Sequence, residues 1–240
     1  MTSGPHLAKP EPCGPRIPKL EPAALDDDQR SLYAQIAGGR RAQGPQLFRL
    51  ADAEGRLEGP FNAFLLQPRL GSALQALGAS VRYDTELDDR CREIAILVVA
   101  AHWRSDFEQY AHEAVARSVG LTDPDLAAIR GGNYAESAAR QAGHAAASAE
   151  RDGHLAEPDS RPSAAGREAV VARTAAALVA RGDLDDAEYR EAVGHLGAAG
   201  VFELLTLVGY YATLALQLRV FRVPAPDQSV PAPDQASQPA

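Results

Sequence analysis

One short segment combines acidic, imidazole and hydroxyl side chains at spacings that suit proton transfer. Glu108 and His112 are four residues apart, so a helix would place them on one face, and Ser105 would share that face. A carboxylate and an imidazole held side by side can exchange a proton with each other or with a bound substrate. Glu93 heads the apolar run before this segment, where a charged group is either solvated or buried for a reason. These residues predict acid–base chemistry.

The elements that must position these side chains read as helix almost throughout. Apolar residues recur at three- and four-residue spacings, and no alternation of period two is long enough to suggest a sheet. We therefore expect an all-α fold. The predicted helices cover residues 26–38, 61–66, 69–81, 87–101, 106–119, 125–130, 167–181, 183–196 and 199–221. The Ala-, Gly- and Ser-rich stretch 131–166 is expected to be partly helical and mobile, as a lid would be.

Two proline-rich ends flank this helical region. Residues 1–24 hold six prolines and few large apolar groups, and the motif Val-Pro-Ala-Pro-Asp-Gln occurs twice after residue 222. Such segments cannot repay the conformational entropy lost on ordering. We predict one helical domain over residues 25–223, with disordered tails at 1–24 and 224–240. The tails could recruit partners, although solubilising ends are the simpler interpretation.

Composition narrows the class of function. The chain of 240 residues has a formal net charge of −8, which argues against nucleic acid as a partner because phosphate binding needs clustered Lys and Arg. The apolar stretch 201–218 includes Glu203, so we expect a buried helix and no membrane span. The start of the chain has no secretory pattern and the two cysteines have no framework spacing, so a cytoplasmic location is expected. No histidine spacing suggests a metal site.

Each central residue also has a structural interpretation. His112 could be a core or interface histidine bonded to a backbone carbonyl, and Glu108 could be its ordinary partner on a solvated helix. Glu93 could be a carboxylate at a helix N-terminus, or half of a buried pair with Arg92 or Arg104. Pairing of Glu108 with His112 favours a functional role for both.

Four further residues are candidates for substrate binding. Ser105 could instead cap the helix that follows it, which is the interpretation we prefer. His102 could line a pocket or pack between helices, and both possibilities stay open. Arg104 could hold a substrate carboxylate, a role for which Arg92 is equally placed by sequence. Asn62 could reach a cavity, although a role in the turn at the start of its helix is simpler.

Four motifs in register resemble the carboxymuconolactone decarboxylase family. They are Gly-Pro-Phe-Asn-Ala-Phe-Leu at 59–65, Arg-Glu-Ile-Ala-Ile-Leu at 92–97, His-Trp at 102–103 with Phe107, Glu108 and His112, and Phe-Glu-Leu-Leu-Thr-Leu-Val-Gly-Tyr-Tyr at 202–211. The order and spacing match from about residue 25 to 223. The resemblance implies an alkyl hydroperoxidase D-like helical bundle in a single domain, assembled as a homo-oligomer, commonly a trimer or hexamer.

The family has a thiol peroxidase branch and a non-thiol branch, and the residues of this chain distinguish between them. The thiol peroxidase branch has a Cys-x-x-Cys pair, and those positions hold Ser105 and Glu108 here, so a disulfide cycle is excluded. By the resemblance, the upstream glutamate of the family corresponds to Glu93 and its histidine corresponds to His112. The non-thiol branch usually has Trp after the glutamate, and this chain has Gln109.

The resemblance therefore implies a cofactor-independent lyase or isomerase acting on a small carboxylated or enolisable ring compound. In this hypothesis His112, with Glu93, supplies or relays a proton, and Glu108 orients His112. The alternatives are a tailoring enzyme of secondary metabolism that catalyses dehydration, cyclisation or isomerisation on the same fold, and a non-enzymatic oligomeric binding protein.

Overall fold

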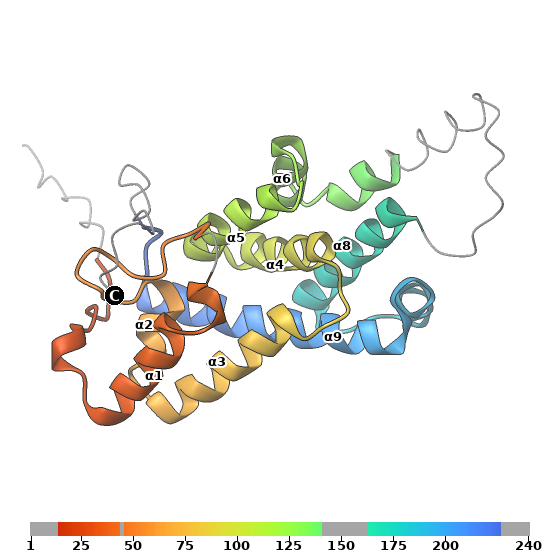
Figure 1. The fold of residues 1–240 in the computed structure, drawn as a ribbon. Coiled ribbons are helices and arrows are strands. Elements are labelled where there is room, and N and C mark those ends of the chain that lie inside the picture. Colours follow the sequence, from red (N-terminus) through yellow and green to blue (C-terminus); the bar gives the residue numbers. More distant parts are fainter. Residues whose placement is uncertain (1–13, 44–45, 141–162, 227–240) are drawn as a thin grey trace, which may run out of the picture.

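A computed structural model describes residues 14–43, 46–140 and 163–226, and the chain in these ranges is helical (Figure 1). No strand occurs there; Ala51 and Leu57 form an isolated bridge. The predicted all-α class is confirmed. The named helices are η1 (Pro22–Ala24), α1 (Asp27–Ala37), η2 (Arg40–Ala42), α2 (Gly59–Phe64), α3 (Pro68–Tyr83), α4 (Asp89–Trp103), α5 (Asp106–Ser118), α6 (Asp123–Arg130), α8 (Ala164–Arg181) and α9 (Asp186–Phe221).

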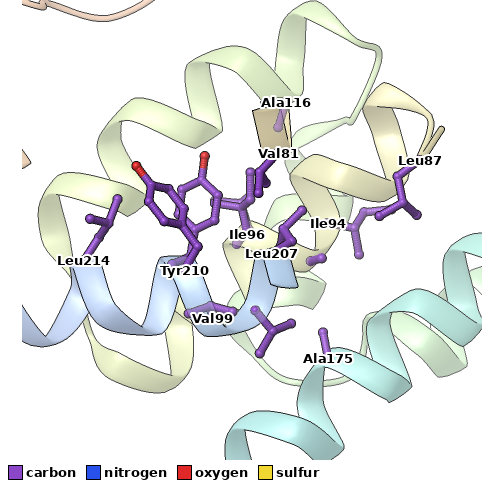
Figure 2. Packing of buried hydrophobic residues seen from close by; sticks show 14 of the residues in the cluster. Val81, Leu87, Ile94, Ile96, Val99, Ala116, Ala175, Leu207, Tyr210 and Leu214 are labelled. Atoms are coloured by element: carbon purple, nitrogen blue, oxygen red, sulfur yellow. The ribbon is translucent and has the colours of Figure 1, made fainter. Parts of the chain in front are cut away.

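Helix α4 is the centre of the bundle. It contacts α5, α6, α8 and α9, which explains why its sequence is apolar on nearly every side. Ile94, Ile96 and Leu97 are fully buried, and Figure 2 shows Ile94 and Ile96 packed near Leu207 of α9. A polar group on such a helix is enclosed by its neighbours, which is the situation of Glu93.

Local sequence signals set the ends of several helices. Asp26 and Gln29 form a capping box at the start of α1, and Thr122 and Asp125 form another at the start of α6. Helix α4 ends at Trp103, and the next residue, Arg104, adopts the left-handed conformation (φ 52°, ψ 52°) and turns the chain directly into α5. This tight turn brings the faces of α4 and α5 together.

Helix α9 runs along the bundle beneath α4 and is crossed by α3 (Figure 1). Gly197 interrupts it with φ 70° and ψ 169°, so its two parts correspond to the helices predicted at 183–196 and 199–221. Among the described residues it is the one helix long and apolar enough to cross a membrane, and half of its most apolar window is buried within the protein.

The segment before α1 packs on the domain. The backbone N–H of Arg16 donates to the Phe221 carbonyl oxygen at 2.8 Å, and Lys19 pairs with Glu58 at 2.7 Å. Residues 14–24, predicted as part of a disordered tail, therefore belong to the folded body. Residues 1–13 and 227–240 of the predicted tails, and residues 141–162 of the predicted lid, lie outside the described ranges.

Candidate active site

A buried hydrogen bond joins the two helices at the centre of the site. Nδ1 of His112, on α5, lies 2.7 Å from Oε2 of Glu93, on α4, and both residues are buried. A carboxylate at this position accepts a hydrogen bond from Nδ1–H, which leaves Nε2 of a neutral ring as the free acceptor. The geometry therefore orients His112 as a base.

The charge of Glu93 is balanced from the other side. Nη1 of Arg82, on α3, lies 3.8 Å from Oε1 of Glu93. Burial lowers the pKa of His112 below its ordinary value; Glu93 opposes this effect, and the positive charges of Arg82 and Arg41 add to it. The imidazole is therefore neutral at pH 7 and able to take a proton.

Glu108 lies one turn before His112 on α5 in a very different environment. The side chain is 2% exposed, and neither carboxyl oxygen has a hydrogen-bond partner among the described residues. Burial raises the pKa of Glu108 to about 8, while the nearby hydroxyl of Ser105, outside good hydrogen-bonding geometry, acts in the opposite direction. Glu108 is therefore mainly protonated at pH 7 and can donate a proton.

His112 and Glu108 both line one cavity. Its volume is about 20 Å³, enough for about one water molecule. The polar groups at its wall come from α5, α9 and the η2 segment, and aromatic side chains form most of the remainder. The lining residues are Arg41, Phe48, Pro60, Phe61, Phe107, Glu108, Ala111, His112, Tyr210, Tyr211 and Leu214.

Two tyrosines of α9 close one side of this cavity. The ring of Tyr211 packs edge-on against His112 with centroids 5.0 Å apart, and Tyr210 packs against Tyr211 at 5.2 Å. Figure 2 shows Tyr210 projecting from α9 on the same side as Leu214. Burial raises the pKa of Tyr210 to about 12, so its hydroxyl is a neutral donor or acceptor at the cavity. A Cβ at Gly78 would lie 2.1 Å from that hydroxyl, which explains glycine at this position of α3.

Part of the chain that forms this site is similar to a known protein family. Residues 68–151 match the family described as "Carboxymuconolactone decarboxylase family". The match spans 84 of the 240 residues, so the similarity to this family concerns that region of the chain. The matched residues include Arg82, Glu93, Glu108 and His112, whereas Arg41 and the two cavity tyrosines lie outside the match. The comparison with curated proteins found no match.

A solved structure shows the same fold over nearly the whole chain. It is the alkylhydroperoxidase AhpD core of an uncharacterised peroxidase-related protein from Ralstonia eutropha JMP134, with a TM-score of 0.61 and 14% sequence identity. The match covers 89% of this chain and 93% of that chain. At this identity the likeness concerns the fold alone, and it confirms the predicted alkyl hydroperoxidase D-like bundle.

Of the site residues predicted from sequence, the structure brings together Glu93, Glu108, His112 and Ser105. Their roles differ from the expectation in one respect: Glu93, and not Glu108, forms the hydrogen bond that orients His112. Ser105 stands at the N-cap position of α5, but its buried hydroxyl does not cap the helix. That hydroxyl instead lies beside Glu108.

The other predicted binding residues lie elsewhere. His102 lines a separate cavity of about 590 Å³ between α4, α6 and α8, and Arg104 is exposed at the turn after α4. The side chain of Asn62 holds the N-terminal segment, since its Oδ1 accepts from Leu20 N–H and its Nδ2 donates to the Pro18 carbonyl oxygen. None of the three contacts the cavity at His112.

Sequence reasoning missed Arg41, Arg82 and the cavity role of Tyr210 and Tyr211. Arg41 stood out only as half of the longest basic run, Arg40-Arg41. The tyrosine pair was part of a family motif, but its position on a buried helix suggested packing. Within the described ranges no three His, Cys, Asp or Glu side chains gather as a metal site would need.

Proposed function

We propose that this protein is a cofactor-independent enzyme that moves a proton to or from carbon in a small carboxylated or enolisable ring compound, as a decarboxylase-type lyase does. The observation that carries the proposal is the presence of a neutral base and a neutral acid in one enclosed cavity. Environments that push the pKa of His112 down and that of Glu108 up create this pair. Family membership of the region that carries both residues supports the same class.

Each group has a defined part in a decarboxylation. The bond between ring carbon and carboxylate breaks, its electron pair is delocalised into the unsaturated ring, and carbon dioxide leaves. Glu108 then gives its proton to that carbon and recovers one from solvent. The hydrogen bond from His112 to Glu93 orients the imidazole, and burial keeps it neutral, so that Nε2 can accept a hydrogen bond or a proton from the substrate.

A second candidate uses the same two groups at once. In an isomerisation or cyclisation, Nε2 of His112 removes a proton from one atom while Glu108 protonates another. The presence of both a base and an acid favours this alternative, which would suit a tailoring enzyme of secondary metabolism. Isomerisation and decarboxylation share the prediction that solvent hydrogen enters the product at carbon.

A thiol peroxidase role, which the description of the Ralstonia protein would suggest, is disfavoured. Ser105 and Glu108 occupy the positions of the cysteine pair, and neither can form a disulfide. Cys91 is fully buried, and burial raises its pKa above the ordinary thiol value, which makes it a poor nucleophile.

The experiment that tests the proposal follows solvent hydrogen. A panel of small carboxylated lactones, including 4-carboxymuconolactone, and enolisable ring ketones is incubated with the protein in D2O and monitored by NMR. We expect deuterium at carbon with the wild-type protein and a loss of about 10²- to 10⁴-fold in rate for His112→Ala and Glu108→Gln. His195→Ala, a histidine of α9 outside this cavity, serves as the matched control. Unchanged exchange in folded His112→Ala would overturn the proposal.

We also propose that the chain forms a homo-oligomer through the outer face of α9. Phe202, Leu205, Leu216 and Val220 are exposed on this face, although all are large and apolar, and Gly209 lies between the two groups. These positions fall on one side of the helix, because their spacings along the sequence are close to whole helical turns. Two antiparallel copies of α9 could therefore pair face to face around a two-fold axis.

A further inference from the structure

The cavity beside His112 contains a positive charge, that of Arg41, with no ion-pair partner among the described residues. Arg41, on η2, is partly buried; its Nε is inaccessible and has no hydrogen-bond partner among the described residues. No ion pair within the described part of the chain includes Arg41. By contrast its neighbour Arg40 is exposed, pairs with Asp84 at 3.1 Å and lies over the ring of Tyr83 at 4.2 Å. Burying a cation without a partner is costly unless a ligand supplies the anion.

The groups around Arg41 leave it unopposed. Glu108, the carboxyl group at the same cavity, is mainly protonated at neutral pH. Glu93 lies behind His112, where it holds the imidazole and faces Arg82. The cavity therefore presents a net positive charge to whatever enters it.

Hydrogen-bond donors converge on the same place. A Cβ at Gly78 would lie 2.9 Å from Nη2 of Arg41 and 2.1 Å from the hydroxyl of Tyr210, so both groups rest against this glycine. Glu108, in its protonated form, adds a further donor at the cavity wall. A guanidinium, a hydroxyl and a carboxylic acid together suit a group with several acceptor oxygens.

The remaining wall suits a flat apolar body. Phe48, Phe61 and Phe107 line the cavity, and the guanidinium of Arg41 lies over the ring of Phe61 at 5.4 Å. Because the cavity of about 20 Å³ holds little more than a water molecule, a ligand must displace side chains at its edge. Arg41 and Phe48 are the lining residues outside α2, α5 and α9, on η2 and on the loop that follows it.

We propose that Arg41 is the anion-binding residue of this cavity and makes it selective for small planar carboxylates, with the guanidinium on the carboxylate and the aromatic side chains against the ring. This inference rests on the proposed function for its biological meaning, but the binding itself does not require turnover. It replaces Arg92 and Arg104 as the candidate carboxylate clamp. The Arg92 guanidinium is bonded to the Leu87 carbonyl oxygen and to Asp89, away from this cavity.

The test compares a carboxylate with its uncharged analogue. Isothermal titration calorimetry measures binding of acetate, benzoate and benzamide to the wild-type protein, to Arg41→Gln and Arg41→Lys, and to the matched control Arg40→Gln. We expect benzoate to bind at least tenfold more tightly than benzamide. Arg41→Gln should weaken benzoate by tenfold or more, Arg41→Lys should lose less because it keeps the charge, and Arg40→Gln should bind as the wild type does.

Three results would overturn the inference: no benzoate binding to the wild-type protein, equal binding by Arg41→Gln, or equal weakening by Arg40→Gln. Circular dichroism and thermal unfolding establish whether each variant is folded. If Arg41→Gln does not fold, Arg41→Lys still provides a decisive test. Measuring deuterium exchange beside benzoate binding, in the wild-type protein and in Arg41→Gln, separates the two proposals. If the wild-type protein binds benzoate but catalyses no deuterium exchange, the proposed enzyme function is refuted and the anion site stands. If the wild-type protein catalyses exchange and Arg41→Gln does so equally, the anion site is refuted and the proposed enzyme function stands.

Discussion

The protonation of Glu108 should be visible in the stability of the protein. An ordinary glutamate has a pKa of 4.5, whereas burial raises that of folded Glu108 to about 8. Between these values the unfolded chain has lost the proton and the folded protein still holds it, so the free energy of unfolding falls as pH rises. The slope is about 1.4 kcal/mol per pH unit, and over the whole interval the loss approaches about 5 kcal/mol. Above about pH 8 this contribution becomes constant.

Replacing Glu108 with Gln removes this titration and keeps the size of the side chain. Other groups titrate equally in both proteins, so the difference in unfolding free energy, variant minus wild type, isolates Glu108. We expect this difference to grow in favour of Glu108→Gln by about 1.4 kcal/mol per pH unit between pH 5 and 8. The buried amide adds only a constant offset.

Urea unfolding at pH 5, 6, 7 and 8, at one protein concentration, measures the difference directly. Glu136→Gln, the same substitution at an exposed position, is the matched control. A difference for Glu108→Gln that does not change with pH would refute the argument that Glu108 is buried in its neutral form.

Three further substitutions test other parts of the account. Glu93→Gln should lower turnover by about 10²- to 10⁴-fold. It should also move the acid limb of the pH–rate profile to lower pH, because Glu93 raises the pKa of His112. If the acid limb does not move, Glu93 has only a structural role. Gly59→Ala should destabilise the fold by about 1–3 kcal/mol, since Gly59 has φ 58° and a Cβ there would lie 2.2 Å from the ring of Phe107; an unchanged thermal midpoint would contradict this close approach. Leu216→Asp should reduce the assembly to smaller species in sedimentation velocity, and an unchanged mass would contradict the α9 interface.

The sequence was most informative where the signal was local. Helices predicted to begin at residues 26 and 125 begin at residues 27 and 123, where capping boxes depend on residues three positions apart. The break near Gly197 was also predictable, since glycine tolerates the positive φ found there. Apolar periodicity sufficed for the all-α class.

The site was predictable only in part, because its contacts join distant segments. The spacing of Glu108 and His112 suggested a pair, yet His112 forms its hydrogen bond with Glu93, which accepts it from another helix. Spacing along α5 cannot reveal that partner, which depends on the left-handed turn at Arg104. Arg41 carried no local signal at all, since its proximity to the cavity depends on how η2 packs against α3 and α9.

The measurement that tests the central claim most directly is carbon dioxide release from 4-carboxymuconolactone by the purified protein, with His112→Ala and His195→Ala assayed beside it. The account predicts release by the wild-type protein and by His195→Ala, and a loss of about 10²- to 10⁴-fold in a folded His112→Ala variant. Release that is undiminished in His112→Ala would contradict the assignment of this cavity as the active site.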